Sequence, residues 1–120
     1  MKQYDAIIIG FGKAGKTLAA ELSNRGWQVA VVERSSMMYG GTCPNIACIP
    51  TKTLVHEAGI AALLYHDDYP KQANLYKQAI GRKNRLTSFL RNNNYERLSK
   101  RPNVTVYTGE AVSYTHLRAH

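Results

Sequence analysis

Gly10-Phe11-Gly12-Lys13-Ala14-Gly15 directly follows the apolar run Ala6-Ile7-Ile8-Ile9. A short apolar run that ends in glycine predicts a buried parallel strand. The first glycine of G-x-G-x-x-G permits a tight turn, and the second lets the backbone approach a pyrophosphate. The third lets the following helix pack on the strand, so that the helix N-terminus faces the phosphates. Gly10, Gly12 and Gly15 are therefore candidate dinucleotide-binding residues.

The same stretch also fits a second phosphate-binding pattern. Extended to Lys16 and Thr17, it matches the G-x-x-x-x-G-K-[ST] sequence of P-loops. Glu33, however, ends the second predicted strand, where a carboxylate can accept hydrogen bonds from a ribose diol. The third predicted strand is followed by Gly109-Glu110 and lacks the Asp that would hold magnesium. We favour dinucleotide binding, with a P-loop NTP-binding phosphotransferase as the alternative.

Hydrophobic periodicity predicts the remaining elements. In chain order we expect a strand over 5–9, a helix over 13–25, a strand over 27–32, a loop over 34–42, a helix from Pro44 to about Leu64 bent near Pro50, a break over 67–70, a helix over 71–99 with the apolar stripe Leu75, Ala79, Leu86 and Leu90, and a strand over 103–108. This order predicts an α/β fold with a parallel, right-handed βαβ core.

Two cysteines, Cys43 and Cys48, lie in the segment Gly40 to Lys52. In a regular helix their Cα atoms would be roughly 8.6 Å apart, whereas a disulfide needs less than about 7 Å. They can therefore bridge only if the helix start is distorted or Cys43 lies outside it. Lys52 can share a helix face with Cys48 and favour a thiolate. Zinc is disfavoured because the chain lacks four suitably spaced ligands, so we expect no metal site.

The formal net charge is +8, and nine Lys or Arg residues against one acid fall within residues 71–101. We interpret this run as a solvated helix face, with a basic nucleic-acid-binding module as a further alternative. No apolar run approaches the ~20 residues that span a bilayer, and no leader-like stretch opens the sequence. We expect a cytoplasmic protein without membrane contact.

The segment Gly40 to Lys52 resembles the G-G-T-C-x4-C-[IV]-P-[ST]-K signature of class I pyridine nucleotide-disulfide oxidoreductases, which include mercuric reductase and dihydrolipoyl dehydrogenase. Residues 10–17, 38–41 and 49–56 are most similar to the bacterial reactive-chlorine-resistance flavoproteins of this family. The resemblance covers about residues 3–111. It implies the N-terminal part of a Rossmann-like FAD-binding domain with a long helical insertion.

The resemblance also implies roles for individual residues. The three glycines would contact the FAD pyrophosphate and Glu33 the adenosine ribose. Gly41 and Thr42 would lie along FAD, and Lys52 near its flavin ring. Cys48 would be the flavin-proximal thiol and Cys43 the thiol that exchanges with substrate. Pro44 and Ala47 depart from the usual aliphatic residue and glycine, which predicts a perturbed dithiol.

Family members are several times longer than this chain. The resemblance implies a homodimeric parent that takes electrons from NAD(P)H and passes them to a small molecule, with a metal ion or oxidant-linked substrate favoured. Residues 1–111 would form a partial FAD-binding domain that is inactive alone. Residues 112–120 resemble a translated sequencing adapter, so we expect a non-native tail.

Overall fold

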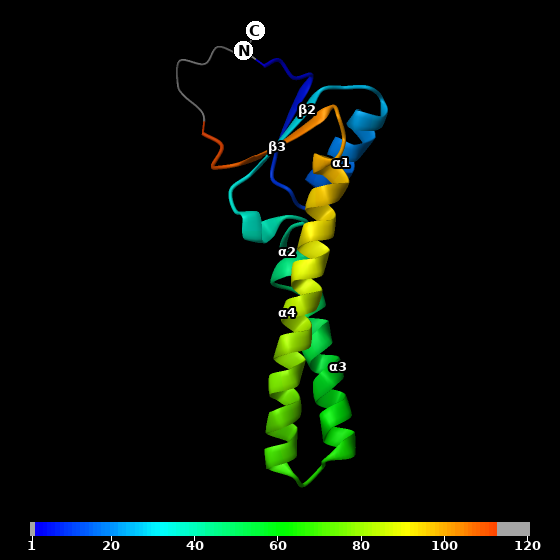
Figure 1. The fold of residues 1–120 in the computed structure, drawn as a ribbon, viewed down its shortest axis with the longest axis vertical. Helices are drawn as coiled ribbons and strands as arrows, with labels where there is room; N and C mark the ends of the chain where they lie inside the picture. Colours follow the sequence, from blue (N-terminus) through cyan, green and yellow to red (C-terminus); the bar gives the residue numbers. More distant parts are fainter. Residues whose placement is uncertain (1, 113–120) are drawn as a thin grey trace.

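A computed structural model describes residues 2–112 of the chain, which form an elongated molecule of 67 × 32 × 18 Å. Figure 1 shows an α/β head at one end and a two-helix hairpin that extends away from it. The elements in chain order are β1 (Ala6–Ile9), α1 (Lys13–Asn24), β2 (Val29–Glu33), a 3-10 turn η1 (Ser36–Met38), α2 (Thr42–Asn45), α3 (Cys48–Leu64), α4 (Tyr69–Ser99) and β3 (Val104–Thr108).

The head contains a three-stranded parallel sheet in the order β1-β2-β3. Ile8, Val31 and Val106 are in register across the three strands and contribute to the core beneath α1 and α4. The opposite face carries Ile7 and Ile9, which are 66% and 74% exposed. The parallel βαβ prediction is therefore confirmed, and the face of the sheet beneath α1 and α4 is buried more fully than the opposite face.

One compact cluster holds the head together. Its fully or nearly buried members are Phe11, Ala19, Val29, Val31, Leu98 and Val104. Leu98 belongs to the last turn of α4, so the long helix is anchored in the head by its C-terminal end. Gly26, with a φ of +85°, follows the last turn of α1 as predicted and donates its N–H to Ser23.

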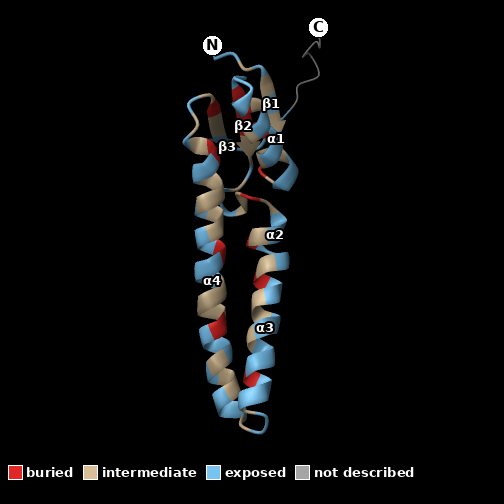
Figure 2. Cartoon of the chain, turned by 90° about the vertical axis from the view of Figure 1, so that its right-hand side faces the viewer, coloured by how far each residue is buried: buried red, intermediate tan, exposed pale blue. Residues whose placement is uncertain are grey.

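The hairpin consists of α3 and the antiparallel first half of α4. Asp68 caps α4 by accepting a hydrogen bond from the Lys71 N–H at 3.1 Å. Arg82 of α4 donates to both carboxylate oxygens of Glu57 on α3, at 2.7 and 2.5 Å. Figure 2 shows few buried residues along these helices, in contrast to the head. No helix within the described range is long and apolar enough to cross a membrane.

Four expectations for the helices and loops were wrong. The helix predicted from Pro44 to Leu64 begins earlier, at Thr42, and is interrupted at Ile46 and Ala47. Pro50 does not bend α3 because it lies in the first turn, where a missing N–H leaves no helical hydrogen bond unmade. The predicted 34–42 loop contains η1 and the start of α2. Leu86 is 38% exposed, and Thr87 is the buried residue instead. The predicted tail lies outside the described residues except for Val112.

Candidate functional site

The glycine loop forms a tight turn between β1 and α1 that depends on its glycines. Gly10 has a φ of +99°, which favours glycine, and a Cβ on Gly15 would overlap the Gly10 carbonyl oxygen. Gly12 faces open space and supplies no capping side chain to α1. The first intrahelical acceptor there is the Gly12 carbonyl, bonded by Lys16 N–H at 2.9 Å. The preceding amides of α1 are therefore available to a phosphate.

Glu33 lies beside this loop at the carboxyl end of β2. Its carboxylate accepts hydrogen bonds from the backbone N–H groups of Phe11 at 2.9 Å and Ser35 at 3.1 Å. A cleft of about 250 Å³ opens here, at the carboxyl ends of the strands, where ligands of parallel α/β sheets bind. It is lined by Ile9, Gly10, Val32, Glu33, Arg34, Gly109, Glu110 and Ala111. Glu33 is therefore placed next to the predicted pyrophosphate-binding loop.

The segment that carries the cysteines packs directly against the glycine loop. Gly41 has a φ of +87°, and a Cβ there would come within 2.8 Å of the Gly12 Cα atom. Gly40 donates its N–H to the Phe11 carbonyl oxygen at 2.9 Å. Gly40 and Gly41 therefore pack against the glycine loop.

Cys43 lies in α2 and Cys48 begins α3, so the helix interruption falls between the two thiols. Both are free and exposed. The side chain of Cys48 raises the pKa of the Cys43 thiol above its ordinary value by hydrogen bonding, and Lys52 opposes that effect. The distortion required for a bridge is therefore present. Ala47 has a φ of −122°, which any L residue can adopt, so its methyl group introduces no left-handed strain.

Asn45 and Arg91 are site residues that the sequence analysis missed. Asn45 is only 8% exposed, and its amide donates to the carbonyl oxygens of Tyr39 at 2.9 Å and Gly41 at 2.7 Å. Arg91 of α4 donates from Nε to Asn45 Oδ1 at 2.9 Å. These bonds fix the turn around Cys43 from both sides. No local sequence pattern predicts this hydrogen bond, because Arg91 and Asn45 are 46 residues apart in the sequence.

The P-loop alternative finds no support in the positions of its two residues. The Lys16 ammonium donates to Asn94 Oδ1 of α4 at 2.5 Å. The Thr17 hydroxyl donates to the Lys13 carbonyl oxygen at 2.7 Å within α1. Among residues 2–112, no group of three or more histidine, cysteine, aspartate and glutamate side chains is placed to hold a metal ion.

Comparison with known proteins identifies the family. Residues 4–119 match the pyridine nucleotide-disulphide oxidoreductases. The chain belongs to this family. It is 50% identical over 122 residues to the probable pyridine nucleotide-disulfide oxidoreductase RclA of Escherichia coli (strain K12), covering 100% of this chain and 25% of RclA. Mercuric reductase of Lysinibacillus sphaericus is 34% identical, with 90% of this chain and 20% of that protein covered.

Solved structures agree with this assignment. The Cu(II) complex of the HOCl-induced flavoprotein disulfide reductase RclA from Escherichia coli superposes with a TM-score of 0.78 at 51% identity. The match covers 92% of this chain and 22% of that one. The chain therefore has the fold of the RclA FAD-binding domain and spans about a quarter of the length of its curated relatives. Members of the family are enzymes that use FAD and NAD(P)H.

Proposed function

We propose that this chain is the FAD-binding, dithiol-bearing part of an oxidoreductase that passes electrons through Cys43 and Cys48 to an external acceptor. The observation that carries the proposal is the contact between the two motifs. The cysteine segment lies against the glycine loop at Gly41 and Gly12, so a dinucleotide on the loop would reach the dithiol. Residues 1–111 would form this unit, which we assign to the cytoplasm.

The residues present fit FAD. The uncapped amides at the start of α1, behind Gly10, Gly12 and Gly15, would bind its pyrophosphate. Glu33 would accept hydrogen bonds from the ribose hydroxyls, beside the cleft that it lines. Thr42 and Lys52 would lie along the cofactor and near its flavin ring. Bound FAD would supply the electrons that NAD(P)H delivers in the longer parent.

The two thiols would carry those electrons onward. Reduction of the Cys43–Cys48 disulfide takes up two electrons and two protons and breaks the S–S bond. Re-formation of the bond delivers the two electrons to the acceptor and releases the protons. We assign Cys48 to the flavin side and Cys43 to substrate exchange.

A metal ion is the acceptor that we favour, and the parent would be a homodimer. Two relatives support a metal: RclA has been solved as a Cu(II) complex, and another relative is a mercuric reductase. Reduction of two Cu(II) ions to Cu(I) would consume the two electrons of one dithiol. The 120 residues alone should show no NAD(P)H turnover, because they span only part of such an enzyme.

Titration of FAD into the 120-residue chain tests the proposal. Quenching of flavin fluorescence should saturate, with weak affinity because FAD contacts in the parent extend beyond these residues. Gly12→Val should reduce binding by about tenfold or more, since a side chain there separates the backbone from the pyrophosphate. Gly59→Val in the middle of α3 is the matched control. Saturable Mg–ATP binding without FAD binding would instead favour a phosphotransferase.

The assignment of the two thiols is tested in the full-length flavoprotein. Cys48→Ser should abolish the long-wavelength absorbance of a thiolate next to flavin, whereas Cys43→Ser should keep it. The reverse pattern would exchange the two roles.

A further inference from the structure

A second cleft, of about 440 Å³, lies between α1 and the C-terminal end of α4, beside the glycine loop. Ala20 and Leu98 are among its apolar lining residues. Four basic side chains line it: Lys13 and Lys16 from α1, Arg97 from α4, and Arg101 from the segment that follows α4. The two helices are far apart in the sequence, so folding itself gathers these cations around one cavity.

Neutral groups hold two of these cations in place. Arg101 donates from Nη1 to Asn24 Oδ1 at 2.6 Å and to Ser23 Oγ at 3.3 Å. Lys16 donates to Asn94 Oδ1 at 2.5 Å. These bonds position the charges but do not neutralise them. Their donor groups are pre-organised for an additional acceptor.

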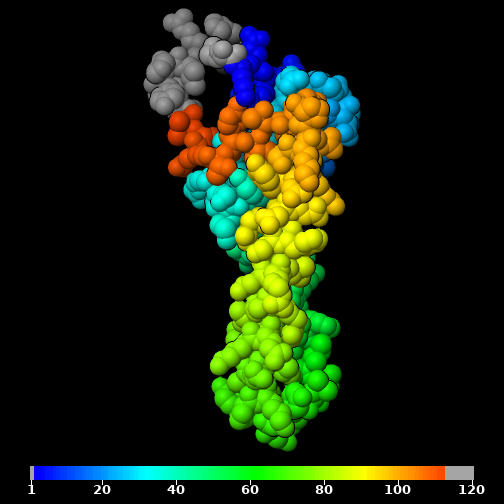
Figure 3. All heavy atoms as spheres, in the orientation of Figure 1, coloured from blue at the N-terminus to red at the C-terminus, as the bar shows by residue number. Residues whose placement is uncertain are grey.

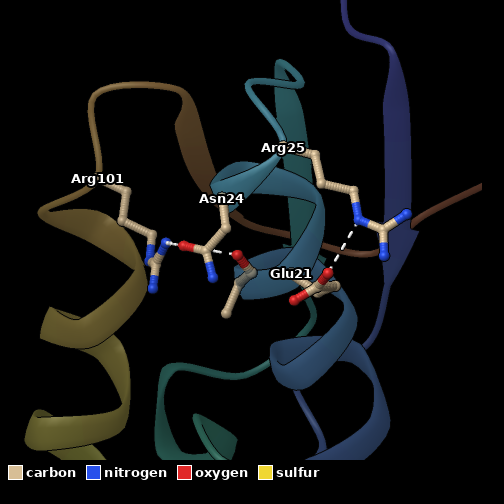
Figure 4. A network of polar contacts seen from close by, with 5 residues as sticks. Glu21, Asn24, Arg25 and Arg101 are labelled. Atoms are coloured by element: carbon tan, nitrogen blue, oxygen red, sulfur yellow. Dashed lines mark hydrogen bonds and ion pairs between the residues drawn. The ribbon is translucent and has the colours of Figure 1, made fainter.

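The acidic side chain at this cleft is directed elsewhere. Glu21 of α1 pairs at 2.9 Å with Arg25, the residue that follows the helix. Figure 4 shows its carboxylate beside Arg25, whereas Asn24 is directed toward Arg101, which follows the C-terminal end of α4. Of the ten residues that line the cleft, Glu21 alone is acidic. The cleft therefore keeps an excess of positive charge.

The crowding of cations in this cleft has an electrostatic consequence. Burial lowers the pKa of Lys16, and the positive charges of Lys13 and Arg97 lower it further. Cations brought together without carboxylates repel one another in the folded chain. A bound anion would relieve that repulsion, whereas solvent screens it only in part.

We infer that this cleft binds a small, multiply charged oxyanion of the phosphate or pyrophosphate class. The site adjoins the proposed FAD loop at Lys13 and extends away from it along α1, which is about 16 Å long from Lys13 to Asn24. Arg97 is exposed, so its side chain would move to contact the bound anion. Arg101 and Lys16 form the fixed part of the site.

Calorimetric titration of inorganic pyrophosphate into the 120-residue chain at low ionic strength tests this inference. One saturable site is expected, and its affinity should fall as salt screens the charges. Arg97→Gln should weaken binding by about tenfold, the effect of losing one charge-assisted contact. Arg97→Lys should recover part of the loss.

Arg85→Gln is the charge-matched control on the same helix, since Arg85 lies about 18 Å along α4 from Arg97. It should leave the affinity unchanged. Absence of saturable binding would overturn the inference, as would an equal loss in the two glutamine variants, which would indicate diffuse attraction only. Binding that FAD displaces and Arg97→Gln leaves intact would place the anion on the glycine loop and also overturn it.

Discussion

The head and the hairpin both carry large apolar side chains, but only the head buries any of them completely. Phe11, Val29 and Val31 are completely buried in the head. In the hairpin, Leu63 is 87% and Tyr69 78% exposed, and α3 carries apolar residues on several faces. Figure 3 shows a broad head that narrows toward the hairpin. Burial of large apolar side chains should therefore stabilise the head, whereas the hairpin buries only small apolar residues such as Ala61 and Ala79 and also depends on the Asp68 cap and the Arg82–Glu57 ion pair.

The dithiol segment lies where these two regions meet. Gly41 packs against the glycine loop of the head, and Arg91 of α4 donates a hydrogen bond to Asn45. The site should therefore be sensitive to changes in either region, but for different physical reasons. The following substitutions separate those reasons.

Glycine-to-alanine changes should give the largest contrast between the regions. In Gly15→Ala the new Cβ overlaps the backbone oxygen of Gly10, which no side-chain rotation can relieve, so we expect a loss of about 3 kcal/mol. In Gly59→Ala the new methyl group meets open space within α3, so we expect a gain of about 0.5–1 kcal/mol. Urea unfolding followed by circular dichroism measures both changes. Similar effects in the two variants would contradict the contrast.

Truncation of apolar side chains should give the second-largest difference in stability between the head and the hairpin. Val31→Ala removes two methyl groups from the core of the head and should destabilise it by about 2 kcal/mol. Leu63→Ala removes more carbon from an exposed position and should change stability by less than about 0.5 kcal/mol. The losses of stability are measured by thermal unfolding of the two variants and of the unsubstituted 120-residue chain. A larger loss for Leu63→Ala would show that the hairpin is covered in solution.

At the junction, Arg91→Met should alter the dithiol more than the fold. Loss of its bond to Asn45 loosens the turn around Cys43 and makes ring closure with Cys48 less favourable. A loss of about 1.4 kcal/mol would raise the reduction potential by about 30 mV. Titration in glutathione redox buffers measures this shift, with Arg85→Met as the control on the same helix. An unchanged reduction potential in Arg91→Met would mean that the Arg91–Asn45 hydrogen bond does not position the thiols.

The smallest effect should be the pH dependence of the hairpin. Arg82 lowers the pKa of the Glu57 carboxyl in the folded chain. The pair therefore stabilises the hairpin above the ordinary glutamate pKa, and this contribution is lost as the pH falls through the lowered value. Arg82→Met should reduce the loss of helicity on acidification, measured by circular dichroism, whereas Arg85→Met should not. Identical acid profiles for Arg82→Met and the parent would contradict this role.

The elements of the head could be predicted from sequence because their signals are local. The run ending at Gly10 and the cap at Gly26 locate β1 and α1 within one or two residues. The interruption between α2 and α3 could not be predicted from sequence, because Ile46 and Ala47 are neither glycine nor proline. The flanking prolines, Pro44 and Pro50, indicate a helix start and a bend at other positions. That break depends on contacts made by Asn45, which exist only after folding.

The motifs of the site could be predicted from the sequence, but the side chains that hold those motifs in place could not. Gly41, Cys43 and Cys48 belong to a pattern that can be recognised in the sequence alone. Arg91 and Asn94 reach this region through the antiparallel return of α4, so their contacts depend on tertiary structure. The basic run of α4 likewise divides in the structure: Arg82 pairs with Glu57, while Arg97 lines the cationic cleft.

The central claim is that Cys43 and Cys48 form a reversible redox pair beside a flavin site. Its most direct test is anaerobic incubation of the oxidised 120-residue chain with reduced FAD, followed by thiol labelling and peptide mass spectrometry. The account predicts that oxidation joins the two cysteines within one chain and that reduced FAD then restores both thiols. Oxidation that gives only intermolecular or mixed disulfides, or a Cys43–Cys48 bond that reduced FAD leaves intact, would contradict it.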